Sequence, residues 1–232
     1  MKQAIAAALE AGQEIMKIYE TEDFGVETKE DDSPLTRADR KAHDIIVSKL
    51  EEHYPSLPVI SEEGNKISFE DRKEWEEFWL VDPLDGTKEF VKKNGEFTVN
   101  IALIRDGSPV FGVVYAPALQ DLYVADEDKR AFKLTSVVGT TEGLTALPLP
   151  VVSIDGDTAR VVASRSHMSE ETQAFIAELQ ESYDSVETVS AGSSLKLCLV
   201  AEGVADYYPR YAPTMEWDTA AGQAIVESSG IL

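Results

Sequence analysis

Residues 79–90 read Trp-Leu-Val-Asp-Pro-Leu-Asp-Gly-Thr-Lys-Glu-Phe and join an apolar segment to a polar turn. The apolar run 78–81 predicts a buried strand that delivers Asp82 at its carboxyl end. Asp85 follows three residues later, so the two carboxylates can converge on one point. Together with the exposed carbonyl oxygen of Leu84, they offer hard oxygen ligands that suit Mg²⁺. The stretch therefore indicates a candidate metal site.

The residues around these two aspartates also have a simpler interpretation. Pro83 predicts a turn directly after the strand, and Asp85-Gly86 is an ordinary turn pair, so a plain turn is an open alternative. Gly86 and Thr87 could instead open a helix, whose free N–H groups and dipole favour a phosphate. The stretch alone does not decide between a turn and a binding site.

Three further segments place carboxylates where elements begin or end. Glu62 follows the predicted strand 58–60 and suits a further metal ligand, although adjacent glutamates in a loop are usually just solvated. Thr36 and Asp39 match a helix capping box, and the Asp39 carboxylate could also orient a hydroxyl. Asp218 opens the last predicted helix, where it is either a third metal carboxylate or a stabiliser of the helix dipole.

Two loop-to-helix segments are candidate anion sites, because each combines N–H groups, hydroxyls and a cation. Each is also compatible with an ordinary helix cap or loop. The candidate substrate-binding residues in these segments are Ser164, Arg165, Ser166 and His167 in one, and Gly192, Ser193 and Lys196 in the other.

The periodicity of apolar residues changes along the chain. The predicted helices are residues 1–20, 36–53, 169–180, 194–202 and 215–226. The predicted strands are residues 24–28, 58–60, 78–81, 97–104, 109–115, 122–125, 131–134, 160–163, 186–189 and 205–208. The middle strands form an antiparallel meander, and the later ones alternate with helices as in an α/β unit. We predict an N-terminal α+β metal-site domain, residues 1–134, and a C-terminal α/β substrate domain, residues 135–232.

Composition excludes several classes of protein. With 43 acidic and 21 basic residues among 232, the net charge is −22, which is a poor match for nonspecific nucleic-acid binding. The apolar runs are too short for a membrane span. Cys198 is the single cysteine, so no intrachain disulfide can form, and a reducing cytoplasm is the default expectation. The charge alone would also suit a noncatalytic acidic module that binds cations.

In combination, these motifs resemble the inositol monophosphatase superfamily of Mg²⁺-dependent, lithium-sensitive phosphatases. The motifs that carry the resemblance are residues 61–63, 82–87 and 217–218. The finer resemblance is to the CysQ-type 3'(2'),5'-bisphosphate nucleotidases. It rests on residues 79–90, 95–104, 112–117, 164–167, 192–196 and 217–222.

The resemblance implies a layered α/β/α/β/α sandwich and a site for two or three Mg²⁺ ions. By position, Glu62, Asp82 and the Leu84 carbonyl would hold one ion. Asp82, Asp85 and Asp218 would hold a second, so that Asp82 bridges the two. Members of this family normally continue past the last helix with a further strand, so we expect the C-terminal domain to be truncated.

The resemblance also implies roles around the reacting phosphate. The backbone N–H groups of Gly86 and Thr87 would bind the phosphate. Thr87 with Asp39, and Glu62, would position and deprotonate the attacking water. Substrate contacts would come from Glu62, Leu84, Asp85, Gly86, Thr87, Asp218 and the two loop-to-helix segments.

The activity implied by the resemblance is release of the 3'-phosphate of adenosine 3',5'-bisphosphate, giving AMP and phosphate, as part of sulfur metabolism. An inositol or sugar monophosphatase with the same metal core is the nearest alternative. The resemblance further implies a cytoplasmic monomer or homodimer, and it allows weak peripheral association with the inner membrane. Against that association, an acidic surface would be repelled by anionic lipid.

Overall fold

The computed structural model describes residues 1–21, 23–28, 34–152, 156–163 and 168–231. Its helices are α1 (Lys2–Tyr19), α2 (Arg37–His53), α3 (Phe69–Arg72), α4 (Thr87–Val91), α5 (Glu170–Gln180), α6 (Leu195–Ala201) and α7 (Glu216–Ser229). Its strands are β1 (Glu27–Thr28), β2 (Pro34–Leu35), β3 (Val59–Ser61), β4 (Glu77–Asp85), β5 (Thr98–Arg105), β6 (Ser108–Ala116), β7 (Asp121–Ala125), β8 (Ala131–Leu134), β9 (Leu147–Pro148), β10 (Thr158–Val162) and β11 (Ser185–Val189).

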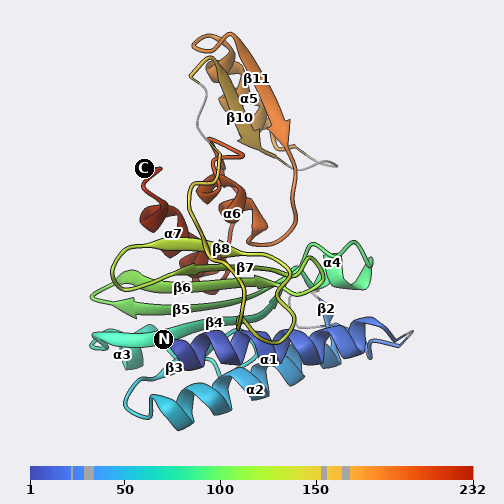
Figure 1. Cartoon of the computed structure of the whole chain (residues 1–232), viewed down its shortest axis with the longest axis vertical. Coiled ribbons are helices and arrows are strands. Elements are labelled where there is room, and N and C mark those ends of the chain that lie inside the picture. The colour runs from blue at the N-terminus through green and yellow to red at the C-terminus, as the bar shows by residue number, and fades with distance from the viewer. Residues whose placement is uncertain (22, 29–33, 153–155, 164–167, 232) are drawn as a thin grey trace.

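A seven-stranded mixed sheet separates two helical layers (Figure 1). Its strands run in the order β3-β4-β5-β6-β7-β8-β9, and all neighbours are antiparallel except β3 and β4. Helices α1 and α2 cover one face, and α6 and α7 cover the other. The parallel pair β10–β11 and helix α5 lie beyond α6. This order of layers confirms the predicted α/β/α/β/α sandwich.

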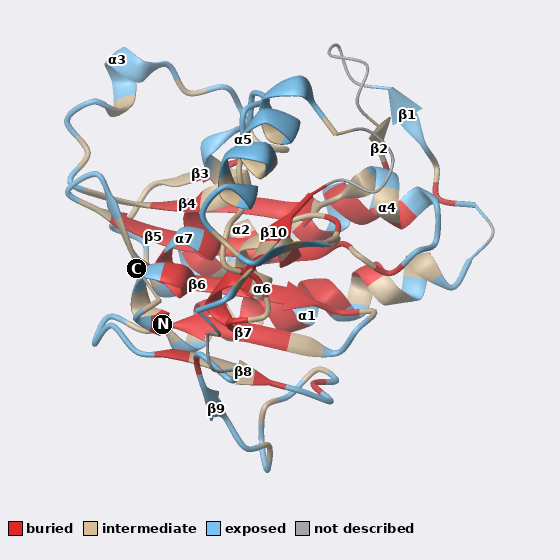
Figure 2. Ribbon diagram, turned by 90° about the horizontal axis from the view of Figure 1, so that it is seen from above, coloured by how far each residue is buried: buried red, intermediate tan, exposed pale blue. Residues whose placement is uncertain are grey.

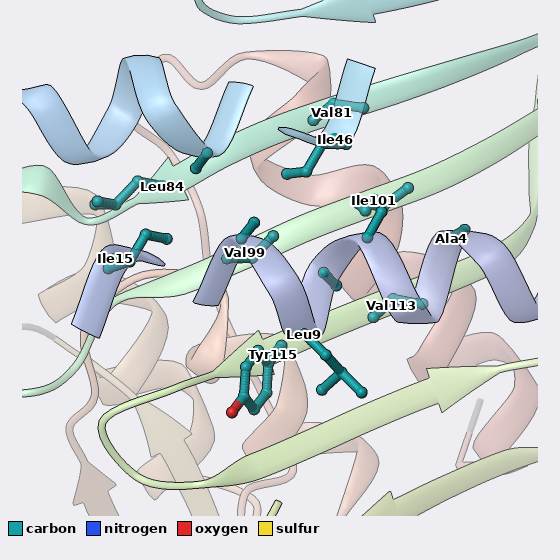
Figure 3. Packing of buried hydrophobic residues seen from close by; sticks show 14 of the residues in the cluster. Ala4, Leu9, Ile15, Ile46, Val81, Leu84, Val99, Ile101, Val113 and Tyr115 are labelled. Atoms are coloured by element: carbon teal, nitrogen blue, oxygen red, sulfur yellow. The ribbon is translucent and has the colours of Figure 1, made fainter. Parts of the chain in front are cut away.

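Both faces of the large sheet are buried, which is why its central strands are apolar on successive residues (Figure 2). Helix α1 packs against one face through small side chains such as Ala4 and through Leu9 and Ile15 (Figure 3). A second apolar cluster, which includes Leu80 of β4 and Ile225 of α7, fills the space between the opposite face and the C-terminal helices. These two cores fix the end of β4 between the helical layers.

One predicted turn and one predicted strand differ from the structure. The turn predicted at Pro83 is wrong, because β4 continues to Asp85 through an irregularity in its pairing with β5. Three steps along β4, from Asp82 to Asp85, match two steps along β5, so the strand bulges, and a proline without an N–H is tolerated there. The strand predicted at 205–208 is also wrong, since among the described residues that segment forms only an isolated bridge between Tyr207 and Val161.

Helix α7 lies across the large sheet and contacts strands β4 to β8. Strand β9 also joins this sheet, so segments on both sides of residue 134 contribute to it; the division into two domains stays a prediction. None of the helices in the described ranges is long and apolar enough to cross a membrane.

The approach of α7 to β6 is close because Gly112 has no side chain. A Cβ at this position would lie 2.5 Å from the carbonyl oxygen of Ala221 and 2.9 Å from the Cβ of Ala224. Both are shorter than ordinary contacts, so any side chain here must push the helix away from the sheet.

Replacing Gly112 with alanine should therefore lower the free energy of unfolding by about 1–3 kcal/mol, the usual cost of overpacking. Urea unfolding followed by circular dichroism measures this. Gly156→Ala is the matched control, because Gly156 is exposed with no atom within 4 Å of its added Cβ, and it should change stability by less than about 0.5 kcal/mol. Equal stability of the two variants would contradict the close packing.

Candidate active site

The parallel pairing of β3 with β4 places two carboxylates side by side. Ser61 is paired with Val81, and the next residues along the two strands are Glu62 and Asp82. The Glu62 N–H donates to the Val81 carbonyl at 3.1 Å, which holds the glutamate against β4. Asp82 is 1% exposed, and its Oδ1 accepts a hydrogen bond from the Leu84 N–H at 3.1 Å.

Acidic side chains surround Asp82. Burial raises the pKa of Asp82 well above its usual range, and the negative charges of Asp85, Glu62 and Asp218 raise it further. Burial also raises the pKa of Asp85 to about 6, although Ser194 donates a hydrogen bond that opposes the shift. Four of the five predicted metal ligands thus share one electrostatic environment, and Leu84, the fifth, lies between Asp82 and Asp85 on β4.

Helix α7 brings Asp218 to this cluster. Its Oδ2 accepts hydrogen bonds from the Thr214 hydroxyl at 2.8 Å and from the Met215 N–H at 3.0 Å, as in a helix capping box. The helix-capping interpretation made from the sequence is confirmed by these hydrogen bonds, while the role of Asp218 as a metal ligand stays a prediction. Asp218 stabilises the start of α7 and also adds its charge to the carboxylates at the end of β4.

The donor chemistry of this cluster fits a hard divalent cation. Carboxylate and carbonyl oxygens are what Mg²⁺ prefers, and a buried carboxylate among like charges is costly unless a cation compensates it. Within the described ranges, no group of three or more His, Cys, Asp or Glu side chains is arranged so that it could hold a metal ion. The residues fit the ion by donor type, burial and shared negative charge, while the ligand set and the number of ions stay predictions.

Asp39 and Thr87 contact each other although 48 residues separate them. One Asp39 oxygen accepts from the Thr36 N–H at 2.7 Å and from the Thr36 hydroxyl at 2.5 Å. The other accepts from the Thr87 hydroxyl at 3.0 Å. Asp39 is 1% exposed, and burial is the main cause that raises its pKa. The capping box and the contact to a hydroxyl, both foreseen from the sequence, coexist.

The candidate phosphate-binding residues come from two loops that meet. Gly86 has φ +88°, a left-handed conformation that favours glycine, and a Cβ there would lie 3.1 Å from the Cβ of Ser193. The Lys196 Nζ donates to the Ser193 carbonyl at 3.4 Å and lies 5.8 Å from the centre of the Tyr208 ring. Helix α4 has only five residues, so its dipole adds little to the N–H groups at its start.

Two adjoining cavities extend from this junction, and Lys196 lines both. The smaller, of about 150 Å³, reaches Asp85, Gly86 and Asp218. The larger, of about 540 Å³, is lined by Gly192 and by side chains of the segment 208–212. The predicted residues Ser164, Arg165, Ser166 and His167 lie outside the described residues.

Three residues at the site were not singled out from the sequence, and a fourth, Ser194, was predicted only as part of the segment 192–196 and not as a contact of Asp85. Asn100 and Ser194 contact Asp85, while Tyr208 and Arg210 line both cavities. An asparagine within the apolar run 97–104 is a detectable signal, because amides rarely occupy buried strand positions. The segment around Tyr208 carries three tyrosines, at 207, 208 and 211, but their pattern predicts a strand at 205–208 and not a binding site.

The whole described chain matches the model of the inositol monophosphatase family, from residue 1 to residue 231. The chain belongs to this family. Membership implies a metal-dependent phosphatase, generally one that uses Mg²⁺. The carboxylates gathered at the end of β4 are the part of this family member that suits such an ion.

Several relatives in the family are similar over nearly all of the chain. The chain is 46% identical over 231 residues to the 3'(2'),5'-bisphosphate nucleotidase CysQ of Salmonella typhimurium. The matched region covers 99% of this chain and 88% of that protein. A crystal structure of CysQ from Bacteroides thetaiotaomicron has a TM-score of 0.87 at 50% identity, covering 99% and 86% of the two chains. The suhB protein of Bartonella henselae has a TM-score of 0.72 at 25% identity, covering 99% and 84%.

The raised carboxylate pKa values predict that Mg²⁺ binding weakens in acid. A cation must displace the proton from Asp85, whose pKa is about 6, so apparent affinity should fall by about tenfold per unit below that pH. Calorimetric titration with Mg²⁺ at pH 7, 6 and 5 measures the change. Asp85→Asn should bind more weakly at pH 7 and show a smaller pH dependence. An affinity for the wild type that is the same at pH 5 and pH 7 would contradict the prediction.

Proposed function

We propose that this chain is a Mg²⁺-dependent 3'(2'),5'-bisphosphate nucleotidase that converts adenosine 3',5'-bisphosphate to AMP and phosphate. The observation that carries the proposal is the position of Lys196, which lines both the small cavity beside Asp85 and the larger cavity. A substrate with two phosphates needs a cation beyond the metal centre. The names of the 43–46% identical relatives, all 3'(2'),5'-bisphosphate nucleotidases, support the same substrate class.

The metal ligands in this proposal are those at the end of β4 and its neighbours. Glu62, Asp82 and the Leu84 carbonyl would hold one ion, and Asp82, Asp85 and Asp218 a second, with a third ion allowed. When bound, Mg²⁺ supplies Lewis-acid stabilisation of the charge on the phosphoryl oxygens. Without it, the acidic cluster would repel an anionic substrate, and the protein's net charge of −22 would add to the repulsion.

The attacking water would be oriented by Thr87. The Thr87 hydroxyl lies 3.0 Å from an Asp39 carboxylate oxygen and 3.3 Å from the Leu84 carbonyl oxygen, and it has one proton to donate. The shorter contact to a carboxylate favours donation to Asp39, which leaves the lone pairs of Thr87 to accept a hydrogen bond from the water. Asp39 is held by its two hydrogen bonds from Thr36 and cannot rotate without losing them. Glu62, next to Asp82, would then accept the proton that the water releases as it attacks phosphorus.

The phosphate would be bound by backbone N–H groups. Gly86 and Thr87 lie at the start of α4, where N–H groups have no partner within the helix. Ser193 adds a buried hydroxyl that has no hydrogen-bond partner among the described residues, and its backbone is left-handed with φ +47°. A buried, unpartnered hydroxyl on a strained backbone is typical of a binding site.

The second phosphate and the nucleoside would occupy the larger cavity. Lys196 supplies the positive charge, and the rings of Tyr208 and Tyr211 offer flat apolar surface on its walls. The segment 164–167 stays a predicted contact. The relatives named as inositol monophosphatases share only 24–26% identity with this chain, which favours the nucleotide over an inositol phosphate as substrate.

The surroundings of the enzyme are proposed more coarsely. A cytoplasmic location agrees with the single cysteine, Cys198, which is free and buried. A monomeric or homodimeric state stays a prediction. Peripheral association with a membrane has no support from the described residues or from the relatives.

Replacing Thr87 with alanine should reduce the turnover number by about 10²–10⁴-fold, the range for a lost acid–base element, with little change in Mg²⁺ affinity. Asp39→Asn should cause a loss of similar order. Because the two side chains act as one unit, the double variant should lose little more than the worse single variant. Steady-state phosphate release and Mg²⁺ calorimetry test this. Collapse of Mg²⁺ binding in Thr87→Ala would overturn the role given to it.

Substrate choice is tested by phosphate release from adenosine 3',5'-bisphosphate and from inositol monophosphate, with and without Mg²⁺. Wild type should prefer the bisphosphate, and Lys196→Ala should lower kcat/KM for it by about 10–100-fold through a lost charge-assisted hydrogen bond. Activity on inositol phosphate, if any, should be nearly unchanged. Lys88→Ala, an exposed lysine on α4, is the control.

Two results would count against the proposal. A wild-type preference for inositol phosphate would reject the nucleotide as substrate. An equal loss of both activities in Lys196→Ala would show that this lysine supports the metal centre or the fold and does not select the substrate.

A further inference from the structure

Two uncharged side chains contact the same oxygen of Asp85, one from β5 and one from the start of α6. Asn100 lies on β5 and is 1% exposed, and Ser194 directly precedes α6 and is 3% exposed. The Asn100 Nδ2 donates to the Ser194 Oγ at 2.8 Å, and that oxygen lies 2.8 Å from the Asp85 Oδ2. The same Ser194 Oγ lies 2.7 Å from the backbone carbonyl of Asp218 in α7.

The donors and acceptors in this group determine where the serine proton can point. A hydroxyl has one proton and two lone pairs, and Asn100 occupies one lone pair as a donor. The proton of Ser194 must therefore go to Asp85 or to the Asp218 carbonyl. An ionised Asp85 attracts it more strongly, because hydrogen bonds to a charged acceptor are about twice as strong as neutral ones.

Burial of Asn100 is expensive unless the residue has a function. Its Oδ1 has no hydrogen-bond partner among the described residues, and an unsatisfied buried polar atom costs free energy. An apolar side chain in the middle of β5 would avoid this cost. The contacts of the amide nitrogen explain the asparagine, because the Nδ2 donates to Ser194 and also lies 3.5 Å from the Asp85 Oδ2.

We propose that Ser194 and Asn100 are positioning residues that set the orientation of the Asp85 carboxylate for cation binding. The inference deepens the proposed function and rests on it for the role of the cation. Through Ser194, the Asp85 carboxylate on β4 is tied both to the start of α6 and to the first turn of α7. The site for the cation is then complete only when these three elements are packed together.

The test is Mg²⁺ binding by calorimetry to Ser194→Ala, with metal-free thermal unfolding measured on the same samples. Loss of a residue that orients a metal ligand typically costs 10–100-fold in affinity, so the apparent dissociation constant should rise by about that factor. The control is Ser229→Ala, another buried serine, whose hydroxyl donates to a backbone carbonyl at 2.7 Å on α7. It should bind Mg²⁺ like the wild type.

A second pair of variants separates positioning from general stability. Ser194→Cys fills nearly the same space, but a thiol is a weak donor, so this variant should also weaken Mg²⁺ binding. It replaces Ser194→Ala in the test if the alanine variant folds poorly. The Asn100 Nδ2 lies 2.8 Å from the Ser194 Oγ and 3.5 Å from the Asp85 Oδ2, so its main contact is with Ser194. Asn100→Ala should therefore weaken binding mainly through Ser194, and adding it to Ser194→Ala should increase the loss only slightly. Additive losses would mean that the two residues act independently.

The proposal is overturned if Ser194→Ala and Ser194→Cys bind Mg²⁺ within about twofold of the wild type, or if Ser229→Ala loses as much. These readouts do not depend on the substrate. If the wild type does not hydrolyse a bisphosphate nucleotide but Ser194→Ala binds Mg²⁺ more weakly, the proposed function is rejected and the positioning role of Ser194 and Asn100 is retained. If the wild type hydrolyses the nucleotide but Ser194→Ala binds Mg²⁺ as the wild type does, the proposed function is retained and the positioning role is rejected.

Discussion

Repulsion between buried carboxylates is the constraint on which the rest of this structure depends. Asp82 is almost fully buried, and its nearest charged neighbours are acidic. Such a cluster is unfavourable by itself, because burial removes the water that would screen the charges. The two cores on either side of the large sheet supply the apolar burial that holds these groups together. The cluster in turn creates a strong preference for a divalent cation.

Short-range hydrogen bonds give three of these four carboxylates a defined orientation despite the repulsion. Asp82 accepts from the Leu84 N–H, Asp85 from the Ser194 hydroxyl, and Asp218 from Thr214 and the Met215 N–H. Each donor is neutral, so orientation is achieved without cancelling the negative charge that a metal ion requires. An arginine or lysine paired to Asp82 would stabilise the metal-free fold and weaken the site.

The fold and the acidic part of the site were largely predictable from local sequence. The strands 97–134 alternate with turn signals, and Asp82 and Asp85 follow an apolar run whose burial is clear from composition. The bulge at Pro83 was not predictable, because the local signal of proline is a turn and only pairing with β5 keeps the segment extended. The contact of Asn100 with Ser194 was missed because it joins residues 94 positions apart, although an asparagine within an apolar strand is itself a local signal.

The dependence of the sheet on α7 has a consequence for synthesis. Strands β3 to β9 and helices α1 and α2 are all made before residue 216, so one face of the sheet is complete while its covering helix is still absent. That face carries the apolar side chains of Leu80, Ala102 and Val114, which are buried in the finished protein. A ribosome-bound chain of about 200 residues would therefore display an uncovered apolar surface. Such a nascent chain is prone to aggregate through this surface, and its acidic cluster at the end of β4 lacks Asp218 until that residue emerges.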